Sequence, residues 1–219
     1  MKTLITSLLF IITINLSAQD FGDAFNQDIF LGFNAGISMD KGEDDFLKNN
    51  GFDVVGLYGG NVSFFELHFA STDLDSWGDS YLKSGGSTSL KYFYPIQTGD
   101  SLGSRFSGYF FGFDLIGVNF FPSTSFIDFV ISGGANTGSK KVRADNKVKY
   151  KNYVFAPKIS GELRLVFNDQ LGLNLHVEQQ YDITKARWKL KKGADVLPGL
   201  QGYKNNALLI SAGISWKLN

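Results

Sequence analysis

Apolar and polar side chains alternate with a period of two along much of the chain, and no segment shows convincing helical periodicity. In the segment 171–178, leucine and valine occupy one set of alternate positions, whereas glycine, asparagine, histidine and glutamate occupy the other set. Successive side chains of a β-strand point to opposite faces, so this pattern predicts strands. The same alternation recurs at 29–37, 65–69, 159–167 and 208–218.

The alternation predicts eight strands, at residues 28–38, 53–70, 87–95, 105–120, 125–143, 147–167, 171–191 and 205–218. Gly59-Gly60-Asn61 interrupts the second strand, as either a bulge or a hairpin turn. The shortest turns lie on one side of the predicted sheet, at 121–124 and 168–170. Longer connections lie on the other side, at 39–52, 96–104 and 192–204. The connection 71–86 is an exception, because it is long but lies on the side of the short turns.

The chemistry of the two strand faces separates a membrane barrel from a soluble sheet. A soluble β-sandwich exposes a densely charged face, whereas here the polar faces carry glycine, serine and asparagine with few charges. Large apolar residues on the other face suit a surface in contact with lipid. The sequence therefore predicts an all-β fold, an eight-stranded antiparallel transmembrane β-barrel with strands protruding beyond the outer surface. A soluble sandwich or lipocalin-like barrel is the alternative.

Residues 1–19 have the features of a secretory signal peptide. Lys2 precedes a mainly apolar stretch from Leu4 to Leu16, and Ser17 and Ala18 offer small residues for cleavage. The apolar stretch is too short and too interrupted for a membrane anchor. We therefore expect export, followed by a single barrel domain over residues 20–219.

Composition and charge narrow the function further. Aromatic residues make up 15% of the 219 residues, and charged residues only 19%. The chain has no cysteine, which excludes disulfides, thiolate metal sites and thiol nucleophiles. Removing Lys2 from 21 basic residues leaves 20, against 21 acidic residues, so the mature chain has a formal charge of −1. This balance does not suit a nucleic-acid-binding protein.

The signal peptide, the alternating segments and a terminal strand, Ala207 to Leu218 with Trp216 near its end, resemble a known family. They are similar to the small outer-membrane β-barrels, such as the OmpA transmembrane domain, OmpX and the PorT-like barrel proteins. The resemblance implies a location in the cell outer membrane. It supplies no universal catalytic residues to transfer to this chain.

The predicted inward faces carry a nearly balanced set of ionisable side chains. They are Glu66, His68, Lys91, Asp114, Asp128, Lys158, Glu162, Arg164, His176, Glu178 and Lys217. The interior of an eight-stranded barrel is just wide enough for side chains to fill it. Because an unpaired buried charge is costly, we expect a network of ion pairs that plugs the lumen instead of a pore.

The two histidines raise the question of a metal site. Glu66 shares a strand face with His68, as Glu178 does with His176, and such a set could ligate zinc. The strands are not adjacent and spacing alone is weak evidence, so the sequence predicts that both histidines belong to the polar network. It predicts neither metal nor cofactor. No serine can be placed beside a histidine–carboxylate pair, so no catalytic residue is predicted.

Nine cations form a predicted patch on three neighbouring strands, which we call the basic ladder. Its members are Lys141, Arg143, Lys147, Lys149, Lys151, Lys185, Arg187, Lys189 and Lys191. From Gln170 to Lys185 a tilted strand rises about 38 Å, whereas the apolar band of a barrel is about 25 Å tall. The ladder therefore starts about 10 Å above the band, at the height of the phosphates of an outer leaflet.

These features predict a non-enzymatic outer-membrane protein, either structural in the envelope or accessory to an envelope assembly. We expect the basic ladder to contact lipopolysaccharide, with an envelope protein as the other partner and no nucleic acid. Charged strand ends that only meet solvent would give the same pattern. The alternative functions are an outer-leaflet lipid-modifying enzyme and a soluble periplasmic ligand-binding β-barrel.

Overall fold

The computed structural model describes residues 27–49, 62–73, 83–97, 105–120, 126–144, 147–167, 170–184, 189–190 and 203–218. These residues form, in chain order, β1 (Gln27–Met39), α2 (Lys41–Asn49), β2 (Val62–Asp73), β3 (Lys83–Gln97), β4 (Arg105–Asn119), β5 (Ile127–Ala144), β6 (Lys147–Phe167), β7 (Leu171–Gln180), β8 (Lys189–Leu190) and β9 (Leu208–Lys217). In the part of the chain that is described, no helix is long and apolar enough to cross a membrane.

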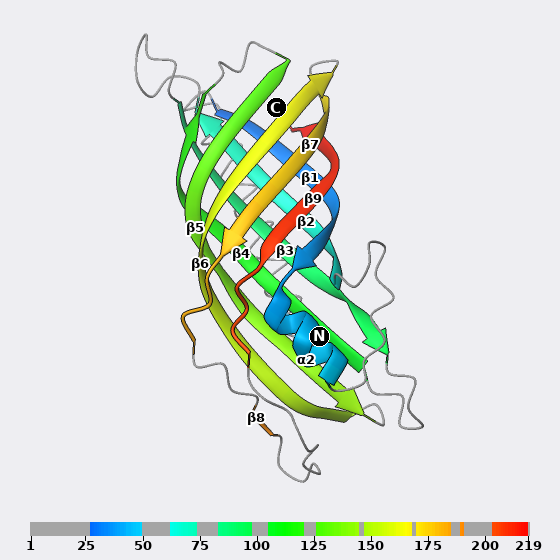
Figure 1. The fold of residues 1–219 in the computed structure, drawn as a ribbon. Coiled ribbons are helices and arrows are strands. Elements are labelled where there is room, and N and C mark those ends of the chain that lie inside the picture. The colour runs from blue at the N-terminus through cyan, green and yellow to red at the C-terminus, as the bar shows by residue number, and fades with distance from the viewer. Residues whose placement is uncertain are drawn as a thin grey trace.

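Eight strands close into one antiparallel barrel (Figure 1). Each strand from β1 to β6 pairs with the next one in the chain, and β9 pairs with both β7 and β1 to complete the ring. The short β8 adds to β6 beyond the end of β7. The predicted eight-stranded antiparallel barrel is therefore confirmed.

The wall of the barrel separates apolar from polar side chains. On β7, Leu173 and Leu175 are 49% and 41% exposed, whereas Asn174 and His176 are each only 3% exposed. Tyrosines lie at one edge of this apolar outer surface and Phe120, Phe167 and Trp216 at the other. From Tyr109 on β4 to Phe120 directly after this strand, the band is about 28 Å tall, for about 3.3 Å per residue and a tilt of about 40°. This is the surface of a barrel that crosses a membrane.

Connection lengths distinguish the two ends of the barrel. The longest connections, 40–61 and 181–207, both leave the end that carries α2. The opposite end has the connections 74–82, 120–126 and 168–170. Since outer-membrane barrels have short periplasmic turns and longer extracellular loops, we assign the α2 end to the outside. Figure 1 shows β5 and β6 extending past β7 and β9 at this end.

The helix α2 contradicts the expectation of a loop at 39–52. The carboxylate of Asp40 caps it by accepting hydrogen bonds from the backbone nitrogens of Gly42 and Glu43, at 2.9 and 3.3 Å. Phe46 and Leu47 on its inner side are buried. The helix is too short to show a clear period, but Asp40 followed three residues later by Glu43 is a helix-start signal that could have predicted it.

An apolar layer fills the outer end of the barrel, which the prediction of a wholly polar interior missed. Phe46 of α2 packs on Tyr203 and Phe106, with ring centroids 5.2 and 6.2 Å apart. Below it, Phe93 contacts Phe64 and Phe110 from the neighbouring strands. The interior is therefore stratified, with the capped apolar layer outside and charged side chains further in.

The regular part of the strand predicted at 171–191 ends at Gln180, although the backbone nitrogens of Tyr181 and Ile183 still donate to carbonyls of β6. The buried carboxylate of Asp182 accepts hydrogen bonds from the backbone nitrogen and hydroxyl of Thr184, at 2.8 and 2.6 Å. This local turn competes with the sheet hydrogen bonds. The pairing of β6 with β7 would place Arg187 opposite Lys151, but Lys189 takes that place. The break therefore inserts two residues, which preserves the inside–outside parity.

Two further strand bounds differ from the expectation. The connection predicted at 71–86 is shorter, because β2 continues to Asp73 and β3 starts at Lys83. Pro95 lies in β3 where its register against β4 shifts, as expected for a residue that has no backbone N–H to donate. Gly59-Gly60-Asn61 and the first part of the predicted second strand lie outside the described residues, as does the predicted signal peptide.

The cap of α2 makes the docking of this helix sensitive to pH. Burial, and then the nearby Glu43, raise the pKa of Asp40 from 3.8 to about 7, against the opposite effect of Lys140. The docked state thus binds a proton more tightly than the undocked state. The stability of docking is therefore expected to fall as the pH rises from about 4 through 7.

Hydrogen exchange of the α2 amides, corrected for intrinsic rates, measures this effect. We expect protection to fall between pH 5 and pH 8 in the native chain and to stay nearly level in Asp40→Asn, which keeps a capping oxygen without the charge. Equal pH dependence in the two proteins would show that Asp40 is not the group responsible.

Candidate functional site

Ten inward-facing side chains are joined by hydrogen bonds and ion pairs into what we call the lumen network. They are Glu66, His68, Lys91, Asp114, Asp128, Lys158, Glu162, Arg164, His176 and Glu178. Each of these ionisable groups was expected in the lumen from sequence parity. Lys217, also expected there, is half-buried, and its backbone nitrogen donates to the carbonyl of Gln170.

Acidic and basic groups alternate along the first half of the lumen network. Lys158 lies 3.1 Å from Asp114 and 3.0 Å from Glu178. Lys91 in turn lies 3.0 Å from Glu178 and 3.3 Å from Glu66. A Cβ atom on Gly112 would lie 3.2 Å from the Lys91 ammonium and closer still to two other side chains, so the glycine leaves room for this lysine.

The second half of the lumen network centres on Arg164. Its Nη1 donates to Asp128 at 2.8 Å and its Nη2 to Glu162 at 2.7 Å. Its guanidinium carbon also lies 3.8 Å from the ring centroid of Phe30. Each carboxylate of this half therefore has a cationic partner, as a buried charge requires.

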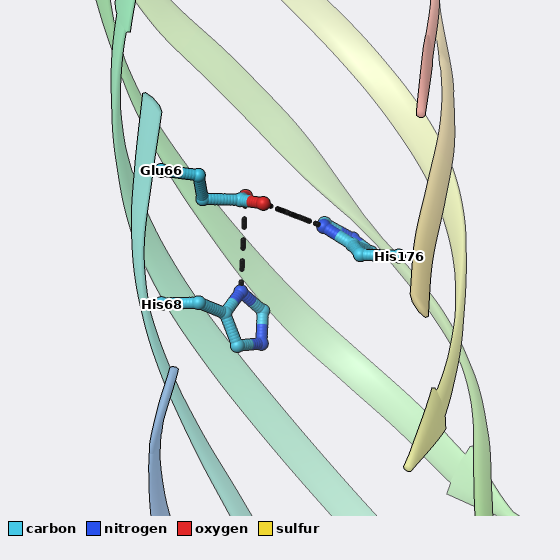
Figure 2. A group of neighbouring side chains, drawn as sticks. All are labelled: Glu66, His68 and His176. Carbon is cyan, nitrogen blue, oxygen red and sulfur yellow. Dashed lines mark hydrogen bonds and ion pairs between the residues drawn. The ribbon is translucent and has the colours of Figure 1, made fainter. Parts of the chain in front are cut away.

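His68 joins the halves through Glu66 and Glu162, and Glu66 contacts both histidines (Figure 2). His176 Nδ1 lies 3.2 Å and His68 Nδ1 lies 3.8 Å from Glu66 Oε1. His68 Nε2 contacts Glu162 Oε2 at 3.1 Å. The structure therefore brings together histidines that the sequence placed on non-adjacent strands. Within the described residues, Glu66, His68 and His176 form a group able to hold a metal ion.

Other buried polar residues at the outer end were not expected from the sequence. Lys140 forms an ion pair with Glu43 of α2, and Tyr203 donates to the same carboxylate at 3.0 Å. Burial, then Glu43, raise the pKa of Tyr203 well above its ordinary value, so this phenol remains a donor. Lys140 occupies an inward position of β5 by parity, but the charged partner on α2 could not be placed without the helix.

The basic ladder is described in part. The backbone positions of Lys141, Lys151 and Lys189 pair in register across β5, β6 and β8. Lys141 is half-buried on the outer wall and Arg143 is exposed two residues further along. The backbones of Lys147, Lys149 and Lys189 lie in strands, but their side chains are outside the described part, and Lys185, Arg187 and Lys191 lie outside it entirely.

Two of the ladder lysines contact tyrosines at the outer edge of the apolar band. Lys151 Nζ lies 4.1 Å from the ring centroid of Tyr153 and donates to its hydroxyl at 2.9 Å. Lys141 Nζ lies 5.0 Å from the ring centroid of Tyr109. Tyrosines of a barrel lie at the membrane–water interface, so these ammonium groups lie at the height of lipid headgroups.

No protein-family model and no curated protein matches the sequence. Among solved structures, the chain is similar to neisserial surface protein A, with 8% identity, a TM-score of 0.46 and coverage of 88% of this chain and 97% of that one. Ail of Yersinia pestis is 12% identical, with a TM-score of 0.46 and coverage of 86% of this chain and 97% of that one. The outer membrane protein OprG of Pseudomonas aeruginosa is also 12% identical, with a TM-score of 0.47 and coverage of 88% of this chain and 96% of that one.

The structure itself fixes the environment of the chain. A closed barrel satisfies all of its backbone hydrogen bonds between strands, which a membrane requires because lipid offers no partners. The apolar band outside and the charged network inside complete the arrangement by which strands cross an outer membrane. The chain therefore has the fold of the small outer-membrane β-barrels and resides in the outer membrane.

Proposed function

We propose that this protein is a non-enzymatic component of the outer membrane whose basic ladder contacts the phosphates of lipopolysaccharide. It would stabilise the envelope or act as an accessory to an envelope assembly. The observation that carries the proposal is the row of Lys141, Lys151 and Lys189, in register on three neighbouring strands beyond the apolar band. Such a row presents several cations to one anionic surface.

The height of the row suits this role. Tyr153 marks the outer edge of the apolar band, and Lys151 lies two residues further along β6, about 5 Å higher for a tilted strand. Each basic side chain near an anionic membrane surface contributes about 1 kcal/mol of attraction. Together the ladder cations would hold lipopolysaccharide firmly while each single contact stays exchangeable.

The closed interior supports a role on the outside of the barrel. The lumen network lies in the middle of the barrel, and α2 packs with the apolar layer at its outer end, beside the protruding strands (Figure 1). The contacts made with the envelope would then be made by the outer wall and the protruding strands. The basic ladder lies on both.

The experiment compares two charge-matched triple variants. Lys141→Gln/Arg143→Gln/Lys151→Gln removes three cations of the ladder. The control, Lys41→Gln/Lys48→Gln/Lys204→Gln, removes three exposed cations from the same end of the barrel, on α2 and in the segment before β9. We expect the ladder variant to fold and to co-purify with less lipopolysaccharide, and its remaining association to be less salt-sensitive, because salt screens exposed charges over about 8–10 Å.

Three outcomes would contradict the proposal. Equal lipopolysaccharide retention by the ladder variant and the native chain at every salt concentration would show that the ladder only meets solvent. Loss of a co-purifying envelope protein with lipid retained would assign the ladder to protein contact. A change in the lipid A mass spectrum that depends on the protein would identify a lipid-modifying enzyme instead.

A further inference from the structure

The lumen network lacks a fixed cation where its two halves meet. In the described part of the chain, Lys158, Lys91 and Arg164 each lie between two carboxylates of the network. Between Glu66 and Glu162 lie the two histidines instead. Uncompensated charge in a buried site is unfavourable, so positive charge must be supplied at this point.

The side chains at this point have the chemistry of a metal site. Glu66, His68 and His176 each offer one ligand atom, and these atoms lie within 4.8 Å of one another. His68 Nδ1 is buried without a hydrogen-bond partner and points toward Glu66 (Figure 2). Two imidazole nitrogens and a carboxylate oxygen are a ligand set of zinc.

The contact of His68 Nε2 with Glu162 leaves the other ring nitrogen, Nδ1, available to a metal ion. With Nε2 donating to Glu162 at 3.1 Å, a neutral His68 directs the lone pair of Nδ1 toward the Glu66 carboxylate. A lone pair facing a carboxylate repels it unless a cation or a proton lies between them. A histidine that ligates a metal almost always donates its other N–H to such an outer carboxylate.

We propose that Glu66, His68 and His176 bind one divalent transition-metal ion, with zinc as the best-suited ion, inside the barrel. The ion supplies positive charge between Glu66 and Glu162 and links β2 to β7, which β1 and β9 separate in the sheet. Zinc ligated at about 2.0–2.2 Å requires the three ligand atoms to move closer, which side-chain rotation allows, and leaves a fourth position for water.

Lys91 does not prevent this binding. It lies 3.3 Å from Glu66 Oε1 but has two other partners, Glu178 at 3.0 Å and Ser89 at 2.9 Å. Glu66 Oε2 is held by Ser211 at 2.6 Å and by Asn34 at 3.1 Å, which aims Oε1 at the two rings. The lysine can therefore lean toward Glu178 while Glu66 keeps its position.

The chain has only two histidines, which makes a direct test simple. Full-length mature protein labelled with 15N-histidine is refolded in detergent with either zinc or a chelator, so that a buried site can fill as the barrel closes. With zinc, we expect the Nδ1 resonances of both rings to move to metal-bound positions while each Nε2 keeps its proton, and about one zinc to remain per chain after dialysis.

Variants separate ligands from supporting groups. His68→Gln and His176→Gln should lose the bound zinc, whereas Asp128→Asn, a lumen-network carboxylate away from the three ligands, should retain it. Glu162→Gln keeps all three ligands and should weaken zinc binding about 10–100-fold. If the imidazole spectra of the native chain are the same with zinc and with chelator, the two rings hold protons and the metal site is wrong. Zinc retention unaffected by both histidine substitutions would also overturn it.

Discussion

Replacing Lys91 with methionine is expected to destabilise the folded barrel by about 3–5 kcal/mol. Lys91 is fully buried and neutralises both Glu66 and Glu178, at 3.3 and 3.0 Å. Methionine fills a similar volume but leaves two carboxylates in the lumen without this partner. Urea unfolding in lipid vesicles, in the presence of a chelator, measures the change in the free energy of unfolding.

Two further variants control for side-chain size and for the pair itself. Lys204→Met removes an exposed lysine and should change the free energy of unfolding by less than about 0.5 kcal/mol. Adding Glu178→Gln to Lys91→Met should recover part of the loss, because it removes one of the two buried carboxylates that lose Lys91 and leaves Lys158 paired with Asp114. A cost of Lys91→Met no larger than that of Lys204→Met would refute the ion-paired interior.

Replacing Leu175 with arginine is expected to cost about 2–4 kcal/mol, because this residue faces the lipid near the middle of the bilayer. Leu175 is on the outer wall and Asn174, its neighbour, is buried in the lumen. Asn174→Ser keeps a small polar group inside and should cost far less. Unfolding in vesicles compares the two variants, and the reverse order of severity would mean that β7 is shifted by one residue.

The barrel could be predicted from the sequence because each wall position faces either lipid or the lumen. Because of this constraint, apolar and polar residues alternate in segments such as 171–178, where exposed and buried side chains also alternate. Parity survives even the break after Gln180, because the break inserts two residues. The strand ends were less predictable, since hydrogen bonds such as those of Asp182 with Thr184 decide them.

The partners within the lumen could not be predicted, because the alternation along a strand shows which side chains point inward but not at what level along the barrel axis each one lies. His68 and His176 lie on strands that are not paired, and their closeness follows from the stagger of strands around the closed ring. The helix α2 was not predicted because its nine residues make too few helical turns for a hydrophobic period to be recognised. Its docking partner Lys140 became recognisable only once Glu43 was placed beside it.

The central claim is that the apolar face of this barrel meets lipid, and spin labels measure it most directly. The chain has no cysteine, so Leu175→Cys and Arg143→Cys give single labelling sites, the first within the apolar band and the second beyond it. In reconstituted vesicles, the label at 175 should be accessible to oxygen, which concentrates in lipid, and shielded from a water-soluble nickel chelate. The label at 143 should show the reverse. Equal access of the nickel chelate to both labels would contradict a membrane-spanning barrel.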